Sequence, residues 1–207
     1  MQMKQTILFI CLLIMGTLAV QAQDAKKAIR QHYADVKAQV NQIQELEKTG
    51  DTYPVPQTYT VIIKQNLPAT GYHEETLQMF YREELKNDEQ IYADLYLDFA
   101  TQKYNFAARE YYQEYLYDKQ GNIEFIYSIE PDVINGIDYE YRFYFSKGRL
   151  IDVLVKSRKT GAGETIFNTI YQGKTVPAQY IDEYKARVAS SKSIMNVFKS
   201  IDKNRHL

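Results

Sequence analysis

Cysteine, tryptophan, glycine and proline are scarce in this sequence, which has 1 Cys, no Trp, 9 Gly and 5 Pro in 207 residues. The low glycine and proline content, together with 45% hydrophobic and 25% charged residues, excludes collagen-like, low-complexity and wholly disordered chains. No apolar run reaches the roughly 20 residues that a helix needs to span a bilayer. The length and composition therefore indicate one folded globular domain.

The N-terminal segment has the layout of a secretory signal peptide. An apolar run of 14 residues, Ile7 to Val20, follows a single charge and leads to the small residue Ala22. We expect cleavage after Ala22, which leaves one domain of residues 23–207 in the periplasm or outside the cell. The alternative, an uncleaved membrane anchor, is disfavoured because the run is short. The only cysteine, Cys11, leaves with the segment, so disulfides, thiolate metal sites and cysteine nucleophiles are excluded from the exported chain.

A helix is predicted directly after this segment. Asp24 can cap it and Gly50 can end it. Apolar residues recur between them at steps of four and three, at Ile29, Tyr33, Val36, Val40 and Ile43. Because the stripe covers only a few turns, we expect the helix to lie on a sheet rather than in a coiled coil.

The central part of the chain has the period of two that is typical of β-strands. We expect seven strands, at about 57–65, 75–85, 91–103, 108–117, 123–130, 138–146 and 149–157. Their connections are too short for crossover helices, so neighbouring strands should be antiparallel. Residues 165–171 fit a strand or a helix, and Pro177 can begin a last helix. The predicted fold is therefore α+β, with an N-terminal helix, a curved antiparallel β-meander of about seven strands, and a C-terminal helix packed on the sheet.

Two glycines indicate hairpin turns and set the expected pairing of strands. Lys147 and Gly148 fit a two-residue turn, and Gly121 fits the left-handed position of a three-residue loop. The expected pairs are Phe145 with Leu150, Phe143 with Asp152, Arg142 with Val153, Tyr117 with Ile123, and Tyr115 with Phe125. In that register the second hairpin has an apolar side made by Tyr111, Tyr115, Tyr117, Ile123, Phe125, Tyr127 and Ile129. The other side carries Glu110, Glu114, Glu124, Ser128 and Glu130.

The opening helix and the hairpins also carry a resemblance. The helix reads AIRQHYADV, and the hairpins read EYLYDKQGNIEFIY and EYRFYFSKGRLI. These segments resemble a group of small exported proteins of Gram-negative bacteria that have no assigned function. The likeness extends as far as Lys156 and rests on turn glycines and strand aromatics, so it implies a fold and no catalytic residues.

Motifs for enzymatic or metal chemistry are not found in the sequence. It has no G-x-S-x-G, H-E-x-x-H or phosphate-binding loop motif, and we expect no cofactor. The three histidines, His32, His73 and His206, are far apart, so we expect no metal site. We also expect no nucleic-acid partner, since the chain from residue 23 carries a slight excess of acidic residues.

One pair of carboxylates could serve a hydrolase. In the expected register Glu110 and Glu130 face each other across two strands at about 5 Å, which is within the range that glycosidases use. Like charges at that distance cost stability, so the strands could instead splay apart at this end, and the following Pro131 favours that alternative. Glu110 and Glu130 are therefore weak candidates for catalytic residues.

A second candidate site consists of Glu140, Arg142 and Tyr144, which share one face of a predicted strand. An arginine inside a strand needs a partner, because burying its charge alone would be costly. One hypothesis is an ion pair with Glu140 or with an acid on another strand. The other is that the guanidinium group binds a ligand carboxylate or phosphate in a cleft covered by tyrosines.

Charge is distributed unevenly along the chain. Residues 23–155 carry 14 basic and 22 acidic residues, whereas residues 156–207 carry 10 basic and 4 acidic ones. The basic C-terminal helix could dock on the acidic sheet and neutralise it, or it could face an anionic envelope surface or a partner protein.

These patterns favour an exported, non-enzymatic binding or accessory module that holds a protein, peptide or glycan. A carboxylate-based hydrolase and an envelope-associated structural protein are the alternatives. The isolated polar groups on an aromatic sheet are the main support for the binding module.

Overall fold

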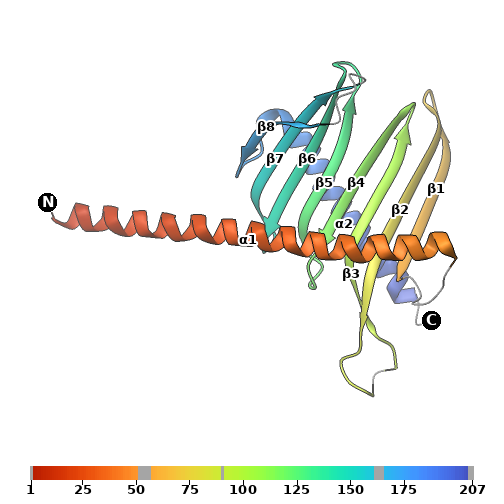
Figure 1. The fold of residues 1–207 in the computed structure, drawn as a ribbon, viewed down its shortest axis with the longest axis horizontal. Helices are drawn as coiled ribbons and strands as arrows, with labels where there is room; N and C mark the ends of the chain where they lie inside the picture. Colours follow the sequence, from red (N-terminus) through yellow and green to blue (C-terminus); the bar gives the residue numbers. More distant parts are fainter. Residues whose placement is uncertain (1, 51–56, 90, 161–165, 205–207) are drawn as a thin grey trace.

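The computed structural model describes residues 2–50, 57–89, 91–160 and 166–204, with side chains described from residue 23 onward. Eight strands form one open antiparallel sheet, in which each strand pairs with its neighbours in the sequence (Figure 1). They are β1 (Thr58–Leu67), β2 (Gly71–Glu84), β3 (Asp94–Phe106), β4 (Arg109–Tyr117), β5 (Ile123–Asp132), β6 (Ile137–Ser146), β7 (Arg149–Lys159) and β8 (Asn168–Gly173). The predicted α+β meander is confirmed, and the segment that fitted a strand or a helix forms the eighth strand.

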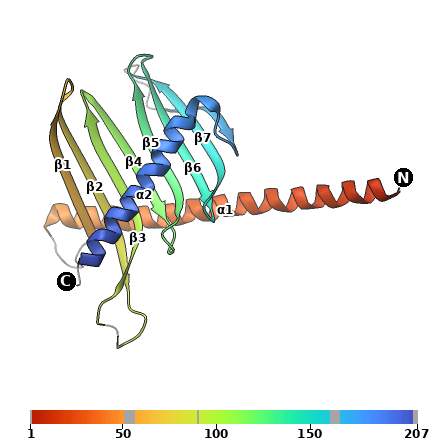
Figure 2. The ribbon, with the colours of Figure 1, turned by 180° about the vertical axis from the view of Figure 1, so that it is seen from behind.

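The two long helices cover opposite faces of this sheet. Helix α1 (Gln2–Thr49) crosses one face, and α2 (Ile181–Asn204), which follows the short 3-10 helix η1 (Ala178–Tyr180), crosses the other (Figures 1 and 2). The molecule therefore has three layers, and we call the two sides of the sheet the α1 face and the α2 face. The central strands bury residues on both sides, for example Leu116 and Tyr117 of β4 and Tyr144 and Phe145 of β6.

Helix α1 is longer than predicted. It begins at Gln2 and runs through Asp24, which we had expected to cap it. The preceding residues are rich in Leu, Ile, Met and Ala and contain no proline, so nothing in them opposes a continuous helix. The N-terminal part of α1 projects past the sheet (Figure 1). Neither helix has a stretch long and apolar enough to cross a membrane within the residues whose side chains are described. Cleavage after Ala22 stays a prediction.

The two predicted turns are confirmed. Gly121 and Gly148 have φ angles of 81° and 72°, the left-handed conformation that glycine adopts without strain. The pairs next to the turns, Tyr117 with Ile123 and Phe145 with Leu150, are also as expected.

Beyond these first pairs, the predicted register is wrong by one residue in both hairpins. One extra residue is inserted in the returning strand, Glu124 in β5 and Ile151 in β7. A bulge of this kind shifts every later pair by one position, so residues that were predicted to share a face lie on opposite faces of the sheet. The observed pairs are therefore Tyr115 with Ile126, Phe143 with Val153, and Arg142 with Leu154, in place of Phe125, Asp152 and Val153.

The bulge in β5 divides the apolar side that we had predicted for the second hairpin. Tyr115, Tyr117 and Ile123 pack in the core beneath α2, whereas Phe125 and Tyr127 pack beneath α1. Both sides carry buried apolar residues, because each is covered by a helix and has its own core.

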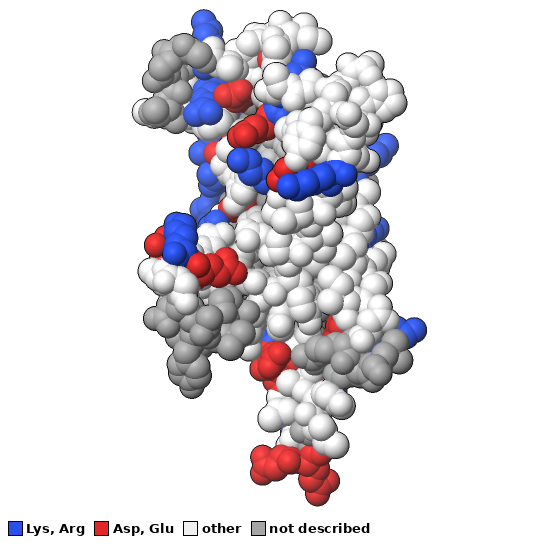
Figure 3. All heavy atoms as spheres, turned by 90° about the vertical axis from the view of Figure 1, so that its right-hand side faces the viewer, with Lys and Arg blue, Asp and Glu red and all other residues white. Residues whose placement is uncertain are grey.

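Figure 3 faces the edge strand β1, whose surface is mostly uncharged. Ile62 and Ile63 are exposed there, at 56% and 42%. Acidic side chains gather on the β2–β3 hairpin that protrudes below this edge (Figure 3). Part of the acidic excess of the first three quarters of the chain is therefore carried by a hairpin rather than by the sheet edge.

Candidate functional site

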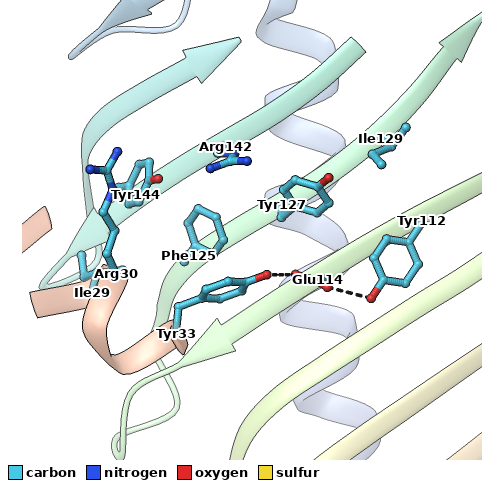
Figure 4. Close-up of a pocket in the computed structure, with 10 residues that line it drawn as sticks. All are labelled: Ile29, Arg30, Tyr33, Tyr112, Glu114, Phe125, Tyr127, Ile129, Arg142 and Tyr144. Atoms are coloured by element: carbon cyan, nitrogen blue, oxygen red, sulfur yellow. Dashed lines mark hydrogen bonds between the residues drawn. The ribbon is translucent and has the colours of Figure 1, made fainter. Parts of the chain in front are cut away.

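A cavity of about 400 Å³ opens between α1 and the sheet (Figure 4). Aromatic and aliphatic side chains form most of its wall, together with two arginines and one carboxylate. The wall consists of Ile29, Arg30 and Tyr33 from α1, Tyr112 and Glu114 from β4, Phe125, Tyr127 and Ile129 from β5, and Arg142 and Tyr144 from β6. The structure thus places two of the three residues of the second candidate site, Arg142 and Tyr144, in the wall of one cavity.

The third residue, Glu140, holds Arg142 in place. Strand alternation directs Glu140, Arg142 and Tyr144 to the α1 face. The Arg142 Nε donates a hydrogen bond of 2.8 Å to Glu140 Oε1, and the guanidinium carbon lies 5.6 Å from the centre of the Tyr127 ring. Arg142 is nevertheless 32% exposed. Of the partners expected for Arg142, Glu140 is the one that it pairs with, and the guanidinium group of Arg142 also lines the cavity.

Glu140 is shared by two cations. Besides Arg142, the Nζ of Lys156 lies 3.5 Å from Glu140 Oε1, and the Tyr127 hydroxyl donates to Glu140 Oε2 at 3.4 Å. Burial lowers the pKa of Arg142, but the nearby Glu140 carboxylate raises it further, and the net change is upward. Burial and the same carboxylate raise the pKa of Tyr127 to about 12, so this phenol stays neutral. One carboxylate facing two cations leaves a positive excess beside the cavity.

Arg30 adds a second guanidinium group at the mouth of the cavity. Its guanidinium carbon lies 5.6 Å from the centre of the Tyr144 ring. Among the described side chains, no carboxylate lies within ion-pair distance of Arg30. Figure 4 shows Arg30 and Arg142 on either side of Tyr144, with their guanidinium groups near the same end of the cavity. Sequence reasoning missed Arg30, although its position three residues before Tyr33 was a signal that it lies near the docked side of the helix.

Glu114 accepts hydrogen bonds at the other end of the cavity. Its partners are the hydroxyl groups of Tyr33 and Tyr112, the latter at 2.7 Å, and the Nζ of Lys37 at 2.8 Å. Burial and the Glu114 charge raise the pKa of both phenols, so both remain proton donors. Glu114 is therefore neutralised by its own partners, and the network fixes α1 against β4. The predicted register had left Glu114 on a polar side, so sequence reasoning missed this role.

The pair proposed for a hydrolase does not form. Glu110 lies on the α1 face, where it is 74% exposed and its Oε2 lies 3.4 Å from Lys103 Nζ. Glu130 lies on the α2 face, where it is 13% exposed and contacts Arg187. The predicted facing of Glu110 and Glu130 is wrong because the bulge at Glu124 shifts the register by one residue.

The two described histidines each have a partner within the protein. His32 Nδ1 lies 2.7 Å from Glu124 Oε2, and His73 Nδ1 lies 2.5 Å from the carbonyl oxygen of Asn105. His206 lies outside the described residues. In the part of the chain with described side chains, no group of three or more His, Cys, Asp or Glu residues could hold a metal ion.

Helix α2 docks through apolar residues rather than through its net charge. Ile194, Met195 and Phe198 are buried against the sheet. In the described region the helix makes one ion pair with the sheet, between Arg187 and Glu130. Its outward lysines, Lys185, Lys192, Lys199 and Lys203, are exposed. The expectation that the helix neutralises the sheet therefore applies to Arg187 alone, and a role of the lysines at an anionic envelope surface stays a prediction.

Comparison of the chain with known protein families, with curated proteins and with solved structures finds no match in any of the three.

Proposed function

We propose that this protein is an exported, non-enzymatic binding module whose cavity beneath α1 takes a ligand with a carboxylate or phosphate group next to an apolar or aromatic body. The C-terminus of a peptide, an acidic side chain or an acidic glycan would supply such a group. Export is part of the proposal and depends on the predicted signal peptide of residues 1–22.

The observation that carries this proposal is the pair of arginines at one end of the cavity. Arg30 has no carboxylate partner among the described side chains, and Arg142 shares its partner with Lys156. The terminal nitrogens of a guanidinium group form a planar fork that matches a carboxylate or a phosphate. Because Arg142 is partly buried and lies on a tyrosine ring, its fork is held in position before a ligand arrives.

The rest of the wall fits the apolar part of such a ligand. Ile29, Phe125 and Ile129 contribute apolar surface, and Tyr33, Tyr112 and Tyr127 contribute rings with neutral hydroxyl groups. A volume of about 400 Å³ lies within the usual range for small-molecule sites. The cavity contains no second acid beside Glu114 and no candidate nucleophile, so its chemistry favours binding over hydrolysis.

The test compares two fluorescent probes that differ in charge, anilinonaphthalene sulfonate and the uncharged N-phenylnaphthylamine. We expect the sulfonate to bind the protein more tightly. Arg142→Gln and Arg30→Gln should each weaken sulfonate binding by about tenfold, since one charge-assisted contact contributes on the order of 1.5 kcal/mol. Binding of the uncharged probe should change little. Fluorescence titration measures both affinities.

Arg149→Gln is the matched control, because Arg149 is exposed at the β6–β7 turn and lies outside the cavity wall. It removes the same charge and should leave both affinities unchanged. Equal loss of sulfonate binding in Arg149→Gln and Arg142→Gln would show that net charge, rather than the cavity, attracts the anion, and the proposal would fail.

A further inference from the structure

A second cavity lies on the opposite side of the sheet, where β5 and β6 meet η1. Its volume is about 490 Å³. The wall is formed by Glu130, Pro131 and Asp132 of β5, Tyr139 and Tyr141 of β6, and Gln179 and Tyr180 from the segment that leads into α2. It contains three phenol rings, two carboxylates and no basic side chain. The charged side chains in its wall are thus acidic, whereas two of the three in the wall of the cavity beneath α1 are arginines.

The three tyrosine rings converge on this cavity with different orientations. The Tyr139 and Tyr141 rings are 5.9 Å apart with an angle of 26° between their planes. Tyr180 stands steeply to both, at 59° and 6.3 Å from Tyr139 and at 71° and 5.6 Å from Tyr141. Aromatic rings that meet at steep angles are the usual surroundings of ammonium groups in proteins, because their π faces attract cations.

Glu130 supplies a carboxylate that its own neighbours satisfy only weakly. Its Oε1 lies 3.4 Å from Arg187 Nη2 and 3.5 Å from Gln113 Nε2, both long contacts for a carboxylate with 13% exposure. Arg187 also pairs with Glu183 through its Nε. One guanidinium group thus faces two carboxylates, and Asp132 adds a third in the cavity wall. When Glu130 is ionised, this end of the α2 face has a negative excess.

The described lysines and arginines do not lie over the three rings. Elsewhere lysines and arginines lie over aromatic rings, as Arg142 does over Tyr127. In the region with described side chains, none lies over Tyr139, Tyr141 or Tyr180. Tyr139 and Tyr180 are partly exposed, so their rings and the carboxylates of the cavity are open to a cation from outside, with the buried Tyr141 also in the wall.

We propose that this cavity binds an organic ammonium group, which lies against Tyr139, Tyr141 and Tyr180 and donates to, or pairs with, the carboxylate of Glu130. The site is separate from the cavity beneath α1, and it does not depend on the function proposed for that cavity. The ligand is a small ammonium compound or a cationic end group, because the carboxylate and the rings line the same cavity.

Binding at this site should depend on pH with a defined sign. Burial raises the pKa of Glu130 to about 8, the Glu183 charge raises it as well, and Arg187 opposes them. The other titratable groups around it are Tyr104 and Tyr115 from β3 and β4 and Tyr141 from β6, whose raised pKa values keep them neutral below pH 9. A cation prefers the ionised carboxylate, so affinity should rise as the pH increases through 8.

The experiment titrates the full-length protein with choline and with its uncharged carbon isostere, dimethylbutanol, and follows the backbone amide signals of Tyr139, Tyr141 and Tyr180 by NMR. We expect choline to bind at least fivefold more tightly than the alcohol. Tyr180→Leu should weaken choline binding by at least fivefold. Between pH 6 and pH 9 the affinity for choline should rise severalfold in the wild-type protein and by less than twofold in Glu130→Gln.

Tyr72→Leu is the control, because Tyr72 is an exposed tyrosine that also lies beside a carboxylate, Glu74, and is outside the cavity wall, on β2. It should bind choline like the wild-type protein. The proposal is overturned if choline and the alcohol shift the same signals with equal affinity, or if Tyr180→Leu and Tyr72→Leu, both folded by circular dichroism, bind choline alike. Sulfonate binding beneath α1 should not change in any of these variants, so failure here is distinguishable from failure of the proposed function.

Discussion

The α1 face and the α2 face are built from the same strands but differ in how the helix is held. On the α1 face, Ile29, Val36 and Val40 pack on a small cluster centred on Phe99 and Phe125, and ionic hydrogen bonds to Glu114 and Glu124 secure the helix. On the α2 face, the helix packs on a larger aromatic and aliphatic cluster. Among the described side chains, the ion pairs found for this helix are those of Arg187 with Glu130 and Glu183.

The two faces also differ in the charge of their cavities. Beneath α1, Arg142 and Lys156 share one carboxylate, Glu140, and Arg30 contributes a further positive charge. Beneath η1 and α2, Glu130 and Glu183 share one guanidinium group, that of Arg187, and Asp132 contributes a further carboxylate. Neighbouring residues of one strand serve opposite cavities, since Tyr141 lines one and Arg142 the other. Strand alternation thus lets one sheet separate two kinds of ligand chemistry without a second domain.

The largest expected effect tests whether the α1 face is a true core. Phe99 on the α1 face and Phe143 on the α2 face are both completely buried. Phe99→Ala and Phe143→Ala should each lower the free energy of unfolding by about 3–5 kcal/mol, measured by urea denaturation. Phe106→Ala, at a side chain that is 46% exposed, should cost less than about 0.5 kcal/mol. A cost for Phe99→Ala as small as that of Phe106→Ala would mean that α1 is a loose cover and would break the comparison.

A smaller effect separates the faces by pH. Glu130 has a pKa raised to about 8 on the α2 face, mainly by burial. The folded protein therefore holds the proton of Glu130 more tightly than the unfolded chain does. The stabilisation that results is complete below about pH 4.5 and is lost as the pH rises through 8. We expect the free energy of unfolding to fall by on the order of 2 kcal/mol across that range, and Glu130→Gln to remove most of the fall.

Glu110→Gln is the control for this measurement, because Glu110 is 74% exposed on the α1 face. It should keep the pH dependence of the wild-type protein. If Glu130→Gln also keeps the pH dependence of the wild-type protein, another group than Glu130 binds the proton. The contrast in charge between the two cavities would then be wrong.

The smallest effect concerns the bulge residue Glu124 on the α1 face. Its hydrogen bond raises the pKa of His32 above 6.5 in spite of partial burial. The pair stabilises the fold below pH 6.5, and this contribution is lost as the pH rises through the raised pKa. The contribution should stay below about 1 kcal/mol, since both side chains are partly exposed.

An NMR titration of the His32 ring measures this shift directly. Glu124→Gln should lower the pKa of His32, whereas Glu45→Gln, an exposed change on the same helix, should not. An unchanged His32 pKa in Glu124→Gln would show that His32 and Glu124 do not interact in solution. Of the two ionic contacts described above for α1, only that with Glu114 would then remain.

The sequence predicted the order of elements well, because the signals involved are local. Period-two alternation located seven strands to within a few residues, and the glycines at 121 and 148 located two turns. Arg142 was expected to pair with Glu140 or with an acid on another strand, because an arginine inside a strand needs a nearby acid, and the pair with Glu140 forms. The proposed carboxylate pair failed because it required a register that held over eight residues beyond a turn.

By itself, the sequence determined an antiparallel meander with a helix at each end, since strand period, turn chemistry and helical periodicity act over a few residues. Only the tertiary structure decided which residues share a face, because one inserted residue, Glu124 or Ile151, reverses the facing of all that follow. It also decided that Arg30, 112 positions before Arg142 in the chain, lies at the same cavity. Such contacts arise from the packing of α1 on the sheet, and no local pattern encodes them.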